Sequence, residues 1–306
     1  MTPLLVGIEI GGTKLQVVTG EPSGAITARF RFAVDRAQGA AGIRQHIQTT
    51  LAQVQQRHRL AGLGVGFGGP IDWATGRICC SHHVEGWSDF PLGEWLHSLT
   101  QAPVRVDNDA NVAALGEARA GAGAGRDPVF YITLGSGVGG GLVNRGTIYH
   151  GAVPGEAEIG HVRLDRAGAT IESRCAGWAV DRRVREAIAR EPAGLLARLA
   201  TGQEGAEARH LGPALQQGDA AAQRILRETC EDLAFGLSHV VHLFHPEVVV
   251  IGGGLSLLGE PLRAGVAATL PQFLMTAFAP GPSVALAALG EDAVPVGALA
   301  LAARPD

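Results

Sequence analysis

Lysine is almost absent from the 306-residue chain, in which Lys14 is the only lysine among 25 basic residues. The net charge is −4, which argues against a protein that binds nucleic acid through a broadly basic surface. No run of about 20 apolar residues is free of glycine, proline and charge, so no membrane span or membrane partner is expected. The amino-terminal residues lack a basic segment, and their apolar run is too short for a signal peptide.

Cysteine is also scarce, with four residues in the whole chain: Cys79, Cys80, Cys175 and Cys230. They do not form a disulfide framework, so a reducing compartment and a cytoplasmic location are expected. The run Cys79-Cys80-Ser81-His82-His83 invites a metal site. Residues this close alternate sides on an extended chain and cannot all converge on one ion, so we do not expect a metal there.

Glycine, in contrast, is abundant, with 44 residues that gather in clusters. Three clusters directly follow apolar segments that read as strands, and they are Gly11-Gly12, Gly135–Gly141 and Gly252–Gly254. Alternation and apolar runs predict strands at 4–10, 15–19, 26–34, 63–67, 104–106, 129–134, 142–143 and 247–251. Apolar spacing of three and four predicts helices at 42–58, 111–120, 178–190, 193–199, 219–245 and 294–302.

Each half of the chain opens with a strand, a glycine turn and a second strand, which indicates a structural duplication. A length of 306 residues also suggests two domains. We predict a small amino-terminal α/β domain over 1–112, with the carboxyl-terminal helix at 290–306 packed back on it. The larger α/β domain is predicted over 113–289.

Glycine loops of this kind can be plain tight turns, or they can surround phosphate oxygens with backbone N–H groups. Thr13, Lys14 and Ser136 add donors to two of them. The segment GSGVGG fits a dinucleotide fingerprint, but that motif needs a following helix, and a β-hairpin is expected here. The P-loop pattern is absent. The remaining interpretation is a nucleotide site that is made of strand–turn–strand loops from two domains.

The motifs IEIGGTK, VDNDAN, LGSGVGGG, EIGH and VIGGGL occur in this order along nearly the whole chain. Together they resemble the ROK family of sugar kinases and repressors, within the actin–hexokinase superfamily. The resemblance implies a two-domain actin-like/hexokinase (ribonuclease H-like) α/β fold with the active site in the interdomain cleft. It also implies ATP and Mg²⁺ as cofactors.

Two departures from the family pattern matter. The first acidic residue of the opening motif is Glu9 instead of the usual Asp, and contact with Mg²⁺ through water could survive the extra methylene. The cysteine-rich zinc loop that follows the Gly-His motif in most members is replaced by RLDRAGATIE. A structural zinc site needs about four ligands, so no zinc is expected. The glutamate that ends that loop is retained as Glu172.

The resemblance assigns the remaining roles residue by residue. Asp109 is the expected general base, and Asp107 is the expected structural carboxylate of that segment. The alternative for Asp107-Asn108-Asp109 is that these residues only cap a helix. The expected sugar-binding residues are Gly69, His83, Asn108, Asp109, Glu158, His161 and Glu172. The expected ATP-binding residues are Gly11, Gly12, Thr13, Lys14, Gly135, Ser136, Gly137, Gly253 and Gly254.

The sequence therefore predicts an ATP-dependent hexose kinase, with glucose as the first candidate and a homodimer as the expected assembly. Fructose, mannose or an N-acetyl amino sugar as substrate, and polyphosphate as donor, remain open. A sugar-sensing repressor of the same family would need a DNA-binding segment before the first phosphate loop, where only eight residues precede Glu9. A non-catalytic sugar-binding protein is disfavoured by the presence of Asp109 and all three glycine loops.

Overall fold

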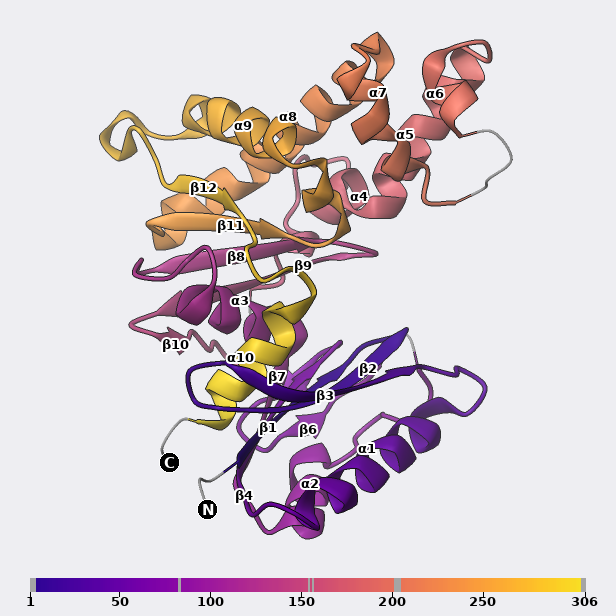
Figure 1. The fold of residues 1–306 in the computed structure, drawn as a ribbon. Coiled ribbons are helices and arrows are strands. Elements are labelled where there is room, and N and C mark those ends of the chain that lie inside the picture. Colours follow the sequence, from indigo (N-terminus) through magenta and orange to yellow (C-terminus); the bar gives the residue numbers. More distant parts are fainter. Residues whose placement is uncertain (1–3, 82–83, 154, 156, 201–204, 304–306) are drawn as a thin grey trace. The chain divides into compact units, whose positions relative to one another are not determined.

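The computed structural model describes residues 4–81, 84–153, 155, 157–200 and 205–303 (Figure 1). Contacts within the chain group it into two compact units. The first contains Met1–Arg126, Gly141–Ala157 and Ala288–Asp306, and the second contains Asp127–Gly140 and Glu158–Ala287. The domain limits expected from the sequence, 1–112 and 113–289, remain a prediction.

The first unit is built on a five-stranded sheet with the strand order β3-β2-β1-β4-β7. The first three strands form an antiparallel meander, and β4 and β7 join β1 in parallel. These strands are β1 (Leu4–Ile10), β2 (Lys14–Gly20), β3 (Ile26–Ala33), β4 (Leu60–Phe67) and β7 (Val104–Asn108). A short hairpin of β5 (Ile71–Asp72) and β6 (Arg77–Ile78) follows β4.

Helices cover both faces of this sheet (Figure 1). On one face, α1 (Gly39–Gln55) and α2 (Leu92–Thr100) bury apolar residues such as Ile47 and Leu96 against Ile8. On the other face lie α10 (Ala293–Ala302) and α3 (Asp109–Ala120), which pack against each other. Alternate residues of β4 on that face are glycines. A methyl group on Gly64 would lie 2.0 Å from the carbonyl oxygen of Ala298, so the missing side chain lets α10 approach the sheet.

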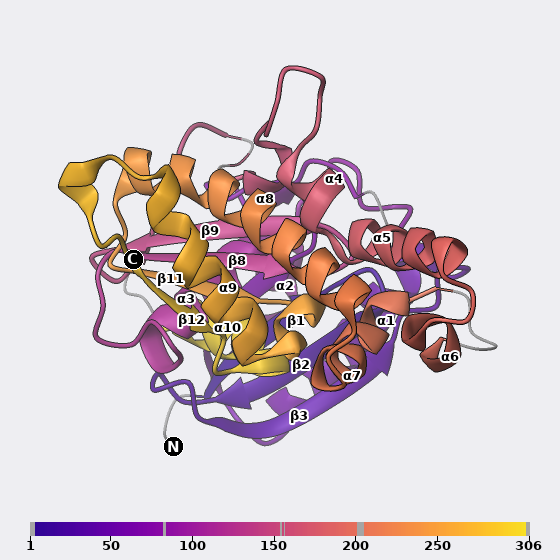
Figure 2. The ribbon, with the colours of Figure 1, turned by 90° about the horizontal axis from the view of Figure 1, so that it is seen from above.

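The second sheet has the strand order β10-β9-β8-β11-β12. Its strands are β8 (Val129–Leu134), β9 (Val138–Asn144), β10 (Thr147–Ile148), β11 (Val248–Gly252) and β12 (Ser283–Leu286). Strands β8, β11 and β12 are parallel and belong to the second unit. Within this unit α8 (Ala220–Phe244) and α9 (Glu260–Thr269) run across one face of these strands (Figure 2).

The second unit contains further helices besides α8 and α9. They are α4 (Ile171–Cys175), α5 (Gly177–Arg190), α6 (Leu195–Leu199) and α7 (Leu211–Gln216), with 3₁₀ turns at Ile159–His161, Glu207–His210, Gly254–Leu258, Leu270–Phe273 and Thr276–Phe278. A further 3₁₀ turn, Gly290–Asp292, precedes α10 in the first unit. No helix among the described residues is long and apolar enough to cross a membrane.

Candidate active site

In the first unit, the predicted site residues follow three neighbouring parallel strands at one edge of the sheet. Ile10, Phe67 and Asn108 are register partners at the carboxyl ends of β1, β4 and β7. The loops that carry Gly11 and Gly69 and the helix that begins with Asp109 start there, and ligands of open α/β sheets bind at such strand ends. The structure therefore brings the first glycine loop and the expected base to one place.

Asp109 is the first residue of α3, and its carboxylate lies beside the loop that follows β4. A methyl group on Gly68 would lie 3.2 Å from Oδ2 of Asp109 and 3.7 Å from Cα of Gly11. Gly68 also donates its N–H to the carbonyl of Ile10 at 2.9 Å, which ties the two loops together. The carboxylate thus lies next to the loop that is expected to hold phosphate.

Asn108 caps the same helix. Its side-chain oxygen accepts the N–H of Ala110 at 2.9 Å, and its amide donates to the carbonyl of Gly69 at 3.1 Å. The helix-cap alternative for this segment is therefore present in the structure alongside the arrangement expected for a sugar site. The predicted sugar contact of Asn108 remains a prediction.

Glu9, the expected magnesium contact, is held by two neighbours on β2. Its Oε1 lies 3.2 Å from Nζ of Lys14, and its Oε2 accepts the amide of Gln16 at 2.7 Å. Gln16 is completely buried and accepts hydrogen bonds from Arg29 and Arg31. Burial raises the pKa of Glu9, and the charge of Lys14 and the bond from Gln16 oppose that rise.

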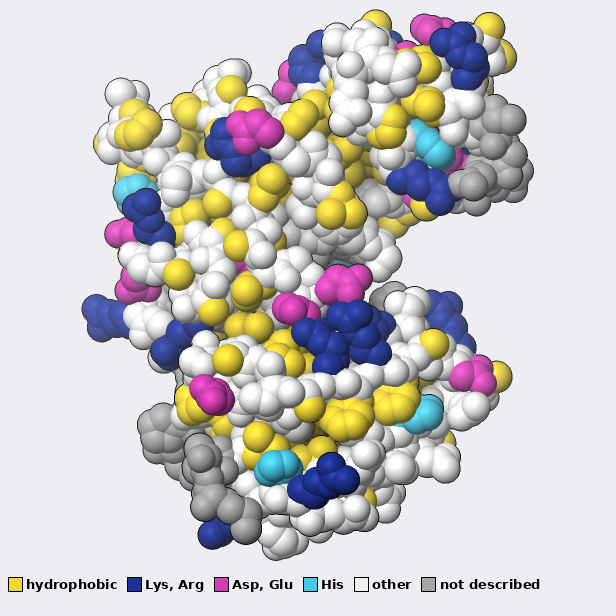
Figure 3. Space-filling model, viewed as in Figure 1, with side chains coloured by type: hydrophobic (Ala, Val, Ile, Leu, Met, Phe, Trp, Pro, Cys, Tyr) yellow, Lys and Arg dark blue, Asp and Glu magenta, His cyan; other side chains and the backbone are white. Residues whose placement is uncertain are grey.

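The two arginines extend this network to the surface. Arg29 pairs with Asp292 at 2.7 Å and Arg31 with Glu291 at 3.7 Å. In Figure 3 basic and acidic side chains gather side by side over this part of the first unit. Glu9 thus sits at the inner end of a chain of charged and amide groups that fixes its orientation.

The remaining predicted residues of the first unit are Gly12, Thr13 and His83. Gly12 and Thr13 lie in the turn between β1 and β2, and Thr13 is exposed. The carbonyl of Thr13 accepts the N–H of Val34 at 3.0 Å, which secures the turn against the end of β3. His83 lies outside the described residues.

In the second unit, two glycine loops meet at the carboxyl ends of β8 and β11. Thr133 and Gly252 are register partners in these parallel strands, so the loops that begin at Gly135 and Gly253 lie side by side. Gly253 has a φ of +80°, and a methyl group there would lie 2.6 Å from the backbone of Leu134. Only glycine fits this close approach of the two loops.

A cavity of about 870 Å³ opens beside these two loops. Its glycine-loop lining includes Gly135, Ser136 and Gly254, and its other walls include Trp178 and Leu258. The N–H of Gly177, the first residue of α5, donates to the carbonyl of Gly135 at 2.8 Å. An apolar cavity bordered by a glycine loop and the amino terminus of a helix suits a nucleotide, whose phosphates favour that end.

The second glycine loop could belong to a dinucleotide fingerprint or to a strand–turn–strand phosphate loop. The element that follows the loop distinguishes these two motifs. Gly135–Gly137 lead into β9, which pairs with β10 in an antiparallel hairpin. A dinucleotide fingerprint would have a helix there. The expectation of a strand–turn–strand loop is confirmed.

Glu158 precedes the 3₁₀ turn Ile159–His161, His161 is its last residue, and both side chains are exposed. The N–H of His161 donates to the carbonyl of Glu158 at 3.0 Å, which keeps the two residues one turn apart. A methyl group on Gly160 would lie 2.2 Å from the carbonyl oxygen of Val138, so this turn packs tightly on the strand after the glycine loop.

Glu172 lies in α4 and touches the same glycine loop. Its Oε2 accepts the N–H of Val138 at 2.9 Å, and a methyl group on Gly137 would lie 2.8 Å from that oxygen. The sequence did not predict this contact. It places the glutamate against the backbone of the expected phosphate loop.

The segment that replaces the zinc loop folds into a small hydrogen-bonded turn. The carboxylate of Asp165 accepts the N–H groups of Gly168 and Ala169 at 2.8 and 3.0 Å. Thr170 and Ser173 then form a reciprocal capping box at the start of α4. Among the described residues, no group of three or more His, Cys, Asp or Glu side chains could hold a metal ion.

The two sheets, with glycine loops at the ends of their strands, have the two-domain actin-like/hexokinase fold of sugar kinases. The chain belongs to the ROK family, whose model matches residues 5–304.

Relatives and solved structures of this family match the chain along almost its full length. A glucokinase of Thermotoga maritima is 32% identical over 305 residues, which cover 97% of this chain and 96% of that protein. A kanosamine kinase of Amycolatopsis mediterranei is 34% identical, with coverages of 98% and 96%. A crystal structure of a ROK family glucokinase from Streptomyces griseus in complex with glucose and AMPPNP is 32% identical with a TM-score of 0.82, covering 98% of this chain and 99% of that chain.

Proposed function

We infer that this protein is an ATP-dependent hexose kinase that transfers the γ-phosphoryl group to a sugar hydroxyl, with glucose as the first substrate to test. The observation that carries this proposal is the cavity lined by Gly135, Ser136 and Gly254 in the second unit. The relatives support it, because glucokinases and a glucokinase structure with glucose and AMPPNP match nearly all of the chain.

Asp109 is proposed as the general base. Its carboxylate accepts the proton of the sugar hydroxyl while that oxygen forms a bond to the γ-phosphorus. The bond between the γ-phosphorus and the bridging oxygen of ATP breaks, and ADP leaves with that electron pair. Lys14 and the N–H group of Gly12 are proposed to bind phosphate oxygens. The N–H of Gly11 donates to the carbonyl of Lys14 at 2.9 Å, so Gly11 is proposed to shape this loop.

The residues of the first unit fit a magnesium ion bound with its waters. Among the described residues, Lys14 contacts one oxygen of the Glu9 carboxylate and Gln16 the other, and a carboxylate offers about four acceptor positions in all. Oxygen ligands and retained water are what Mg²⁺ prefers. When bound, the ion would neutralise charge on the phosphates, with Glu9 orienting its waters.

Glu158, His161 and Glu172 are proposed to hydrogen-bond the remaining sugar hydroxyls, with Asn108 and the backbone of Gly69 from the first unit. A site built from such groups rejects analogues that lack a hydroxyl, because buried polar groups would then lose their partners. Because one relative is a kanosamine kinase, amino sugars are the second substrate class to test.

A coupled assay of ADP release over a panel of hexoses, amino sugars and N-acetyl derivatives tests the proposal. We expect Mg²⁺-dependent turnover with at least one hexose, and a rise in melting temperature with the same sugar. No turnover above the blank and no thermal shift with any sugar would refute it. Polyphosphate in place of ATP distinguishes the two donors, and light scattering tests the homodimer that we also propose.

A further inference from the structure

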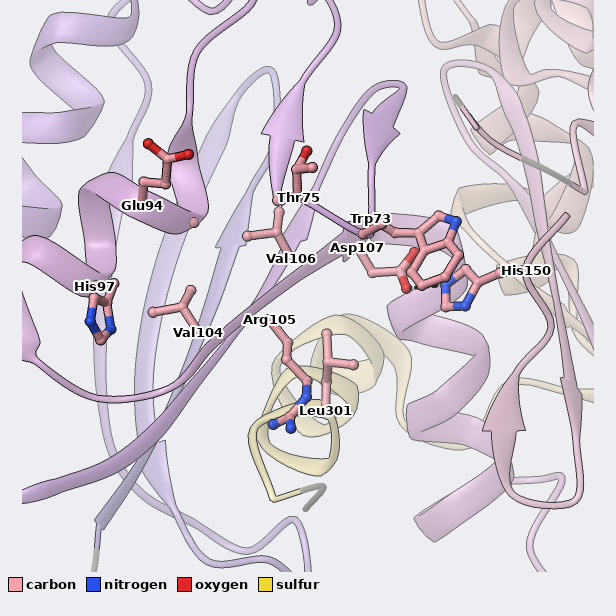
Figure 4. Close-up of a pocket in the computed structure, with 13 residues that line it drawn as sticks. Trp73, Thr75, Glu94, His97, Val104, Arg105, Val106, Asp107, His150 and Leu301 are labelled. Atoms are coloured by element: carbon pink, nitrogen blue, oxygen red, sulfur yellow. Dashed lines mark hydrogen bonds and ion pairs between the residues drawn. The ribbon is translucent and has the colours of Figure 1, made fainter. Parts of the chain in front are cut away.

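A second cavity, of about 510 Å³, lies in the first unit near the segment that carries Asp109 (Figure 4). At one end of it the indole of Trp73 stacks on the imidazole of His150. The ring centroids are 4.1 Å apart and the planes differ by 13°. Trp73 comes from the turn between β5 and β6, and His150 follows β10. Neither residue was singled out by the sequence.

A nitrogen at the edge of the imidazole binds a buried carboxylate. Nε2 of His150 lies 2.7 Å from Oδ2 of Asp107, a residue that is 2% exposed, and Figure 4 shows Trp73, His150 and Asp107 close together. Since the carboxylate oxygen accepts, Nε2 carries the proton in this contact. The stack with Trp73 limits the rotation of the ring, so the donor stays aimed at Asp107.

Asp107, whose carboxylate is held by His150, also hydrogen-bonds residues at the start of α3. Its Oδ1 accepts the backbone N–H of Asn108 at 2.8 Å and the side-chain amide of Asn111 at 2.9 Å. These two donors lie on either side of Asp109, one residue before it and two residues after it. The orientation of the Asp107 carboxylate therefore contributes to holding the backbone on which Asp109 sits.

We infer that His150 is a positioning residue for Asp109: it fixes Asp107 and, through it, the first turn of α3. This inference rests on the proposed function, in which Asp109 accepts the sugar proton. A displacement of about 1 Å at a reacting group can cost on the order of 100-fold in rate. His150 would thus act on the chemical step without touching either substrate.

The two functions of the imidazole can be separated by two substitutions. His150→Phe keeps a flat ring against Trp73 but has no donor for Asp107, whereas His150→Gln restores an N–H donor. We expect kcat to fall about 10- to 100-fold in His150→Phe, with the KM for sugar changed by less than about 3-fold. His150→Gln should recover most of that loss.

A matched control is His97, which lines the same cavity from α2 and contacts the carbonyl of Ala102 at 2.9 Å instead of Asp107. His97→Phe should leave kcat within about 2-fold of the wild type. Asp109→Asn supplies a second control. If His150 acts through the base, His150→Phe should add little further loss of kcat in the Asp109→Asn background.

Hydrogen exchange measured by mass spectrometry tests the positioning role without any turnover. Exchange of a peptide that contains residues 107–111 should rise in His150→Phe and stay unchanged in His97→Phe. If the wild-type protein phosphorylates no sugar, the proposed function fails while this measurement still decides the role of His150.

Three results would overturn the inference: unchanged kcat in His150→Phe, an equal loss of kcat in the Asp109→Asn background, or unchanged exchange at residues 107–111. Should His150→Phe fail to fold, Trp73→Ala removes the stack from a side chain that is 37% exposed. Trp73→Ala should raise hydrogen exchange in the same peptide and lower kcat. If either quantity stays unchanged in Trp73→Ala, the inference is refuted.

Discussion

The contact of Glu172 with the glycine loop leads to a prediction about two different substitutions. Glu172→Gln keeps an oxygen that can accept the N–H of Val138, now 2.9 Å from Oε2, but removes the negative charge. Glu172→Ala removes the acceptor as well. The two variants therefore separate a role toward the sugar from a role in holding the phosphate loop.

The expected magnitudes follow from these bonds. A hydrogen bond from a carboxylate to a sugar hydroxyl contributes roughly 1.5–3 kcal/mol, so its loss in Glu172→Gln should lower kcat/KM for sugar about 10- to 100-fold. The KM for ATP should barely move, because the amide oxygen replaces Oε2 on Val138. In Glu172→Ala the N–H of Val138 loses its partner, so the KM for ATP should rise as well.

Steady-state kinetics in which sugar and ATP are varied in turn measure both effects, and thermal unfolding checks that each variant folds. Glu186→Gln is a suitable control, because Glu186 lies on α5, its side chain is 54% exposed and it pairs only loosely with Arg190. Unchanged sugar kinetics in Glu172→Gln would show that Glu172 only braces the glycine loop, with Glu158 and His161 left to bind that side of the sugar.

The remaining predictions concern the base, one glycine and the metals. Asp109→Asn should lower kcat about 10²–10⁴-fold while calorimetry still detects sugar binding, and a near-normal kcat would place the base elsewhere. Gly253→Ala should destabilise the fold by more than about 1 kcal/mol and raise the KM for ATP, since φ is +80° and the backbone of Leu134 blocks a side chain; an unchanged melting temperature contradicts this. Elemental analysis should find well under one zinc per chain, and stoichiometric zinc lost together with the fold on chelation would refute the expectation. EDTA should abolish turnover and Mg²⁺ restore it, whereas turnover that persists in EDTA would remove Mg²⁺ from the proposal.

Much of the fold could be predicted from periodicity and turn chemistry. The strands at Leu4–Ile10 and Val129–Leu134 have the predicted limits, and the long helix of the second unit, Ala220–Phe244, differs from its prediction by one residue at each end. Helix α2 (Leu92–Thr100) was not predicted, since it is only nine residues long and has no side-chain cap. Helix α1 begins at Gly39, three residues before its apolar pattern, because helix ends depend on tertiary contacts such as that of Ala40 with Glu85.

Some features of the site can be recognised from local sequence motifs, whereas others arise only when distant residues come together in the fold. Glycine clusters after strands are a local pattern, and the sequence located all three of them. The partners of the charged residues are distant in sequence: Asp107 meets His150, and Glu172 meets Val138. Such pairs follow from strand order and helix packing, which a single sequence does not display.

Hydrogen bonds hold the segment before Glu172, where the family pattern has a zinc loop. A zinc ion would fix the chain before Glu172 through several side chains at once. Here the Asp165 turn and the capping box of Thr170 and Ser173 supply hydrogen bonds within one short segment. A closed turn of few residues loses little entropy on ordering, so modest bonds are enough to hold α4. The glutamate at its start then needs only one long-range contact, to Val138, to be fixed against the glycine loop.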